Sequence, residues 1–351
     1  MPDGQQLISY FIGDKGLFTF GESLDANGTD FKHFRGDSRV FEQLPERFKS
    51  GSVFLEEGDL TTYATWYISS FLFFVFAFFF YKALFETVEF ARYIEKKGNE
   101  RNCFITTWTA NTHHFIINYL VICSLLAPQC DLSTPFKFSY DEVCFFTVDT
   151  NGVRNIMFTC GYLTYDFFVL NIFHNLTDKT TRQMVWHHVV AVSGLFAAVY
   201  VGFSMSNIGN MALTCEVSTI FLNYRSMYKK EELNLPVPLV NQIIFFITFT
   251  IFRVINFPLV VLYQAYSVYM LFGKVDSLQK ICLLLQFAQF IWMTWLNFHW
   301  YSLILKGLKK LLQANGLLAA DPPKDKKTED EHKKNQLKDK LIESEAKEGP
   351  K

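Results

Sequence analysis

The sequence lacks the motifs of several large enzyme classes. It contains no GxxxxGK[ST] loop and no HExxH pair, which argues against a P-loop nucleotide hydrolase and a zinc protease. It has no CxxC pair and no Cys/His set with zinc spacing, so we expect no metal site. The repeated HxxxH and HxxHH boxes of membrane di-iron oxygenases are also missing, since Met184 stands three residues before His187. A di-iron enzyme is therefore disfavoured.

The sequence also has no excess of positive or negative charge. Lys and Arg number 33 against 34 Asp and Glu, and no segment forms a basic domain, so we expect no nucleic-acid partner. The first residues lack both the basic start and the apolar core of a signal peptide. We expect the first apolar span to direct the chain to its membrane.

Long apolar runs are what the sequence has in abundance. Half of its residues are hydrophobic, and 39 are phenylalanine, mostly in the middle of the chain. Runs of about 20 apolar residues, at about 1.5 Å per residue, cross about 30 Å of hydrocarbon. The sequence therefore predicts an all-α, polytopic membrane bundle of about seven transmembrane helices. The expected spans are 63–85, 104–127, 155–174, 184–203, 206–224, 239–263 and 279–305.

Loop charges predict the orientation of these spans. Basic residues cluster after the first, third, fifth and seventh spans, which places the N-terminus outside and the C-terminus on the cytoplasmic or matrix side. The loop 128–154 then lies on the opposite side and contains Cys130 and Cys144, for which a disulfide is chemically permitted. The polar fifth span, 206–224, is expected at the centre of the bundle.

The fourth span contains two adjacent histidines, His187 and His188. Ionisable groups at membrane depth are costly and usually face a protein interior or a wet cavity. His187 shares a helix face with Ala191, Gly194 and Ala198, whereas His188 heads another face. A stripe of small residues either lets a second helix approach closely or leaves a narrow slot.

Acidic side chains in neighbouring spans are candidate partners for His187. Asp166 in the third span, with Tyr162 one turn before it, has the chemistry to orient an imidazole, and a structural salt bridge is the alternative. In the fifth span, polar residues share one face and a basic residue closes the helix: Glu216, Thr219, Asn223 and Arg225.

Single polar residues in other spans have simpler expected roles. Arg253 lies deep in the sixth span and is expected to pair with Glu216 or Asp166, because an unpaired buried guanidinium is very unfavourable. Pro258 is expected to distort the same span. Three further histidines, His113, His114 and His299, are interpreted as anchors at the membrane interface.

Four segments, in their order and spacing, resemble the TLC-domain family. This family joins the translocating-chain-associating membrane proteins, the longevity-assurance ceramide synthases and the ceroid-lipofuscinosis membrane proteins. The segments are 161–166 (GYLTYD), 185–188 (VWHH), 216–225 (EVSTIFLNYR) and 296–307 (LNFHWYSLILKG). Among the branches, the chain looks most like the "TLC domain-containing" proteins. In the ceramide synthases a His-Asp pair stands where this chain has Cys215 and Glu216, which argues against amide synthesis.

The resemblance implies a core of six helices around a lipid-sized cavity that opens toward one leaflet, in the endoplasmic reticulum or endomembranes. The leading hypothesis is a protein that binds or modifies membrane lipids there, with acyl-CoA or a phospholipid as ligand. His187 would act as general base or acyl acceptor, Asp166 as its orienter and Glu216 as a second acid or base. The remaining expected lining residues are His188, Tyr162, Thr219, Asn223, Arg225 and Arg253.

The alternative hypothesis is a non-catalytic accessory subunit of a large membrane complex, for example in the mitochondrial inner membrane. Its contacts with other subunits would come from the two ends of the chain. The expected organisation is a peripheral N-terminal segment (1–60), a first transmembrane helix with a basic loop (61–103), a TLC domain (104–312) and a charged tail (313–351).

Overall fold

The computed structural model describes residues 57–87, 99–126, 145, 148–228, 235–316 and 318–319. The N-terminal segment, the loop with Cys130 and Cys144, and the charged tail lie outside these ranges, so the predictions for them stay predictions. The chain divides into two compact units, Met1–Ile304 and Leu305–Lys351. All contacts discussed below lie within the first unit.

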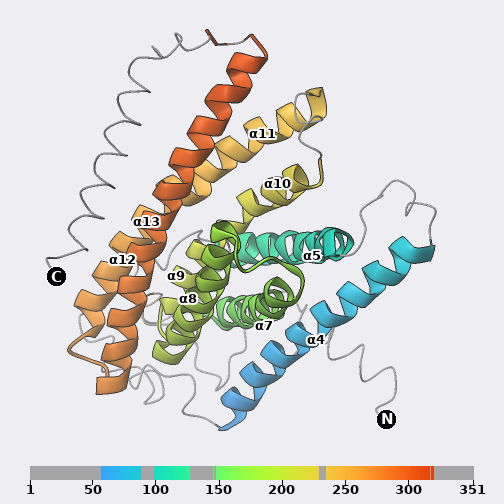
Figure 1. Cartoon of the computed structure of the whole chain (residues 1–351). Helices are drawn as coiled ribbons and strands as arrows, with labels where there is room; N and C mark the ends of the chain where they lie inside the picture. The colour runs from blue at the N-terminus through green and yellow to red at the C-terminus, as the bar shows by residue number, and fades with distance from the viewer. Residues whose placement is uncertain are drawn as a thin grey trace, which may run out of the picture. The chain divides into compact units, whose positions relative to one another are not determined.

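Every regular element in the described ranges is a helix (Figure 1). In chain order the helices are α4 (Glu57–Thr87), α5 (Asn99–Leu126), α7 (Thr150–Phe173), α8 (Lys179–Val201), α9 (Met205–Leu213), α10 (Glu216–Ser226), α11 (Pro236–Phe249), the π-helix η6 (Thr250–Ile255), α12 (Asn256–Leu271) and α13 (Ser277–Ala314). The all-α prediction is confirmed.

Five described stretches are long and apolar enough to cross a membrane: Thr61–Glu86, Thr150–Phe173, Thr181–Val201, Pro236–Leu271 and Ser277–Gln313. This number is lower than the seven spans predicted. Helix α5 is 28 residues long but too polar to qualify, and the predicted fifth span is divided.

The prediction of one continuous helix over 206–224 is wrong. Helix α9 ends at Leu213, and α10 begins at Glu216. The Thr214 hydroxyl donates to the carbonyl of Met211 at 2.7 Å, and Nδ2 of Asn256 donates to the same carbonyl at 2.9 Å. Side-chain bonds of this kind offer the backbone an alternative to the helical ladder, which explains the break.

Close packing of α4 on α7 depends on Gly161. A β-carbon at this position would lie 2.6 Å from the Ser70 β-carbon and 2.6 Å from the Tyr67 carbonyl oxygen. Directly beside it, the Ser70 hydroxyl donates to the Phe158 carbonyl at 2.6 Å. The first residue of the GYLTYD segment is therefore small because another helix backbone occupies the space.

Helices α11, η6 and α12 form one continuous rod that runs beside α13 (Figure 1). The sequence predicts this rod as a single span that Pro258 distorts. The structure has a π-helical segment just before this proline. Proline lacks an N–H and its ring clashes with the carbonyl four residues earlier. A wider π-turn accommodates both effects.

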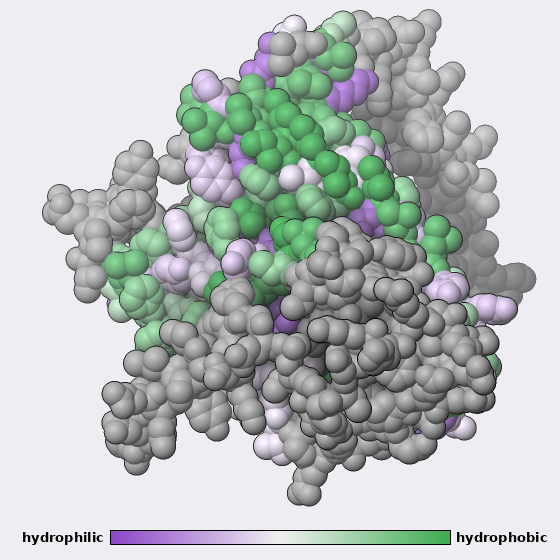
Figure 2. Space-filling view, turned by 180° about the vertical axis from the view of Figure 1, so that it is seen from behind, coloured by the Kyte–Doolittle hydropathy of each residue, from purple (hydrophilic) through white to green (hydrophobic). Residues whose placement is uncertain are grey.

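Many large apolar side chains lie on the outside of the described helices. Tyr269 is 81% exposed, Phe76 69% and Trp186 64%. Figure 2 shows one face, on which such hydrophobic residues gather in a broad patch. An apolar exterior of this extent suits hydrocarbon rather than water as the solvent.

Candidate functional site

A cluster of ionisable side chains lies inside the apolar bundle, contributed by α5, α7, α8, α10 and η6. Six of its members are at most 8% exposed, and the seventh, Asp166, has a side chain that is 16% exposed. We call this group the buried ionisable cluster; it consists of His113, His114, Asp166, His187, His188, Glu216 and Arg253. Burying so many polar groups in one place is unfavourable unless they are paired.

The shortest contact between ionisable groups in the cluster joins α5 to α10. Nδ1 of His114 lies 3.0 Å from Oε2 of Glu216, while Nδ1 of His113 lies 3.3 Å from Nδ1 of His114. The prediction that His113 and His114 are interface anchors is wrong, because they are 0% and 3% exposed. Helix α5 begins at Asn99, five residues before the predicted start, so both histidines lie near its middle.

Tyr162 connects α7 to the same histidines. Its ring stacks on His113 with centroids 3.8 Å apart and planes 9° apart. Nε2 of His113 also lies 3.4 Å from the Thr159 hydroxyl, one turn earlier on α7. Tyr162 was predicted to line a cavity; in the structure its ring packs against His113 of the cluster on α5.

Asp166 contacts the second histidine of the pair rather than the first. Its Oδ2 lies 3.5 Å from Nε2 of His188, whereas His187 packs against the Trp300 ring at 5.8 Å between centroids. The predicted contact between His187 and Asp166 is therefore wrong. Adjacent residues point about 100° apart around a helix, and the rotation of α8 turns His188 toward α7.

The two imidazoles on α8 keep unused hydrogen-bonding atoms. Nδ1 of His187 and Nδ1 of His188 are both buried, and neither has a partner among the described residues. A buried polar atom without a partner is costly, so each of these atoms calls for a ligand or water.

A side chain of α13 lies against the small-residue stripe on α8. A β-carbon at Gly194 would lie 2.5 Å from Oε1 of Gln289, and Nε2 of Gln289 donates to the Ser193 hydroxyl at 2.8 Å. The Gln289 side chain thus occupies the space that Gly194 leaves beside α8.

Arg253 does not form the predicted ion pair with Glu216 or Asp166. Nε donates to the Ser218 hydroxyl at 2.8 Å, Nη2 to the Thr219 hydroxyl at 2.8 Å and Nη1 to Oδ1 of Asn297 at 3.5 Å. The guanidinium also lies 5.4 Å from the Phe249 ring centroid. The planar guanidinium thus donates to uncharged side chains of α10 and α13. It does not pair with Glu216, because that carboxylate already contacts His114.

The other predicted site residues lie near the end of α10. Nδ2 of Asn223 donates to Oδ1 of Asn111 at 3.1 Å, which ties α10 to α5. Arg225 is exposed in the last turn of α10, outside the buried ionisable cluster. His299 is half-buried and stacks on the exposed Trp295, in keeping with a peripheral position.

The structure thus separates the three residues predicted to act together. Glu216 contacts His114, Asp166 contacts His188, and His187 contacts neither carboxylate. A pocket of about 460 Å³ lies beside the cluster, between α4, α5, α10 and α11, and none of these three residues lines it. Within the described ranges, no group of three His, Cys, Asp or Glu residues is arranged to hold a metal ion.

One signal in the sequence could have indicated the role of α5. Asn111, His114 and Asn118 recur at i, i+3 and i+7, and all three are buried. A polar stripe of this period within an apolar helix marks a face turned to the protein interior.

The fold and this buried polar interior define a polytopic helical membrane protein. Residues 140–306 match the model of the TLC domain. No curated protein and no solved structure matches the chain. The matched segment is just under half of the chain's length and contains α7 to α12 and most of α13, which supports a protein of the TLC-domain family.

Proposed function

We propose that this protein binds a membrane lipid at the buried ionisable cluster, with the polar end of the lipid against His187 and His188. The observation that carries the proposal is the pair of buried Nδ1 atoms without partners on these two side chains. Since Nε2 of His188 lies next to Asp166, its Nδ1 is the natural acceptor. A lipid with a hydroxyl or amine group would supply the missing donor.

The arrangement also supports a finer proposal, which is acyl transfer to that hydroxyl or amine from an acyl-CoA or a phospholipid. His187 would take the proton of the attacking group, and the pair of Asp166 and His188 beside it would stabilise the resulting positive charge. As the acyl bond to CoA or to the phospholipid breaks, His187 would return this proton to the leaving thiolate or alkoxide. Glu216 would contribute through His114, since the two are in contact. Residence in the endoplasmic reticulum belongs to this proposal, with the mitochondrial inner membrane as the alternative.

Mass spectrometry of the lipids that copurify with the full-length protein tests lipid binding. We expect His187→Phe to change the lipid profile, because phenylalanine keeps a ring of similar size and removes both ring nitrogens. His299→Phe is the matched control, since this histidine is half-buried on α13 and stacks on a peripheral tryptophan.

A wild-type lipid profile in His187→Phe would contradict the proposal and favour the accessory-subunit alternative. Incubating the purified protein with acyl-CoA and membrane lipids tests the finer proposal separately. Product formed by the wild type and by His299→Phe, but not by His187→Phe, is the result expected for a transfer reaction, and no product from the wild type would contradict it.

A further inference from the structure

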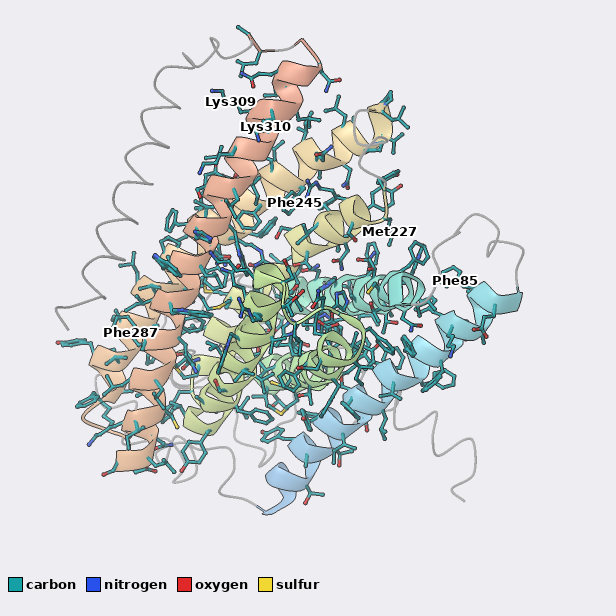
Figure 3. The ribbon with its side chains drawn as sticks, in the orientation of Figure 1. Phe85, Met227, Phe245, Phe287, Lys309 and Lys310 are labelled. Carbon is teal, nitrogen blue, oxygen red and sulfur yellow. The ribbon has the colours of Figure 1, made fainter. Side chains whose placement is uncertain are left out.

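The pocket of about 460 Å³ between α4, α5, α10 and α11 lies near the ends of three of these helices. Tyr81 is in the last two turns of α4, Tyr224 is in the last turn of α10, and Asn241 is in the second turn of α11. Met227, a further lining residue, lies just beyond α10 (Figure 3). Helix ends lie near the surface of the membrane, so both water and lipid headgroups are within reach of this pocket.

Half of the residues that line the pocket are aromatic. They come from α4, α5 and α10, and they are Tyr81, Trp108, Phe115, Phe221 and Tyr224. The rings of Tyr81 and Trp108 have centroids 6.2 Å apart and planes 40° apart, so they form a corner rather than a flat stack. The face of an aromatic ring is electrically negative and attracts cations, and sites for quaternary ammonium ligands are built from several such rings. The walls of the pocket therefore favour a cation over a neutral ligand of the same shape.

The charges around the pocket favour the same sign of ligand. Among the described residues, no charged side chain lines the pocket, and Arg225 in the last turn of α10 is exposed and is not a lining residue. Tyr224 and Met227 place the pocket at the C-terminal end of α10. The aligned peptide dipoles give this end of a helix a partial negative charge, which stabilises a cation near the last turn.

The polar side chains of the pocket are largely bound to one another. The hydroxyls of Tyr81 and Thr112 are 2.8 Å apart, and Oδ1 of Asn111 accepts from Asn223 at 3.1 Å. Nδ2 of Asn241 donates to a backbone carbonyl of α10 at 3.0 Å. A primary ammonium has three N–H donors and would exchange water for walls with few free acceptors. A quaternary ammonium has no N–H and loses no hydrogen bond here.

We propose that this pocket binds a quaternary ammonium group, such as the trimethylammonium of choline, against the faces of its aromatic rings. The volume is in the usual range for sites of small ligands. Free solutes and the headgroups of choline lipids share this group, and both have access to the membrane surface. The site goes beyond the proposed function, because it does not include His187, His188 or Asp166 and selects its ligand by charge.

Choline and its carbon isostere form a matched pair of probes. The isostere, 3,3-dimethylbutan-1-ol, has the shape of choline but a carbon atom in place of the charged nitrogen. Saturation-transfer NMR titrations measure choline, the isostere and ethanolamine on the full-length protein in a maltoside detergent. We expect choline to bind about tenfold more tightly than either of the others. Met227→Trp fills the pocket, and its signal is subtracted as the contribution of ligand in the micelle.

Two substitutions of Met227 test the role of charge at one position. Met227→Lys puts a like charge beside the ligand and should weaken choline binding about tenfold, whereas Met227→Glu should strengthen it by about the same factor. The uncharged isostere should bind equally to both variants.

A change in the preference for choline over the isostere reports on the aromatic rings. Tyr224→Leu keeps an apolar side chain at the rim and removes one ring, so this preference should fall about threefold. Trp186→Leu is the control, because Trp186 is exposed on α8 away from the pocket, and the preference should not change.

Nanodiscs distinguish the two sources of the ligand. Weaker binding of free choline in phosphatidylcholine than in phosphatidylethanolamine would show that a lipid headgroup fills the pocket, and equal binding would show that the pocket serves a free solute. Equal affinity of the wild type for choline and the isostere, or equal choline binding by Met227→Lys and Met227→Glu, would overturn the proposal. His187→Phe should bind choline as the wild type does, so failure of this site and failure of the proposed function are separate results.

Discussion

Nδ1 of His114 and Oε2 of Glu216 are 3.0 Å apart and hold α5 to α10 inside the apolar bundle. Neither helix qualifies as a membrane span by its own hydropathy and length. The side chains that α10 buries are those of Glu216 and Ser218, so this contact contributes to holding α10 in place. Removing one partner of a buried pair leaves the other without compensation.

We expect Glu216→Gln and His114→Gln each to reduce the free energy of unfolding by about 1–3 kcal/mol. The double variant should lose less than the sum of the two, with a coupling of about 0.5–3 kcal/mol, because both changes remove the same contact. Unfolding by SDS titration in mixed micelles measures this cycle. Strict additivity would show that the two side chains act independently.

Gly161→Ala should destabilise the protein by about 1–3 kcal/mol, since the new methyl group would overlap the backbone of α4. Gly307→Ala is the matched control, because a β-carbon at that helical position meets nothing within 4 Å. The control should be neutral or stabilising by about 0.5–1 kcal/mol. Thermal unfolding followed by fluorescence in one detergent compares them, and equal midpoints would contradict the close approach of α4 and α7.

Arg253→Lys should be nearly as damaging as Arg253→Met, although it keeps the positive charge. A lysine ammonium cannot reach Ser218, Thr219 and Asn297 in the planar geometry of the guanidinium. We expect a loss of about 2 kcal/mol or more in both variants, from acceptors left without a donor. Arg225→Lys, at an exposed position of α10, should be silent in the same unfolding assay.

Asp149 makes the stability of the protein depend on pH in a predictable direction. It caps α7 just outside the membrane span, and burial raises its pKa although the Ser124 hydroxyl and the Asn151 N–H both bind its carboxylate. The folded state therefore binds this proton more tightly than the unfolded state does. The sign follows: the contribution of Asp149 to stability is lost as the pH rises above its unfolded pKa of about 3.9.

We expect the thermal midpoint of the wild type to fall relative to that of Asp149→Asn as the pH rises from about 4 toward neutrality. Asp178→Asn is the control, because Asp178 caps α8 in the same way but is exposed. A midpoint difference that does not change with pH in Asp149→Asn would contradict this expectation.

Hydropathy and length predicted the described membrane helices well, because a helix that crosses lipid has to be apolar over about 20 residues. The first span was expected at 63–85 and α4 covers Glu57–Thr87; the third was expected at 155–174 and α7 covers Thr150–Phe173. The break between α9 and α10 escaped prediction, because it depends on Asn256, a residue distant in the sequence that bonds to the Met211 carbonyl.

The composition of the buried ionisable cluster could be predicted only in part. Asp166, Glu216, Arg253 and the histidine pair were expected inside the bundle, and all are buried or nearly so. Their partners depend on how each helix is rotated about its axis. Hydropathy leaves this rotation uncertain by about 100°, which is the angle between the side chains of His187 and His188 around the helix axis.

The π-helical segment Thr250–Ile255 places one extra residue in a rod that would otherwise be a plain α-helix. Because the wide turn absorbs the extra residue, deleting a single residue there would leave the two flanks of the rod close to their present orientation. The side chains inside the segment would move most, and the Arg253 guanidinium would lose its bonds to the Ser218 and Thr219 hydroxyls on α10. The π-helical segment therefore serves the arginine, while the length of the span needs no such device.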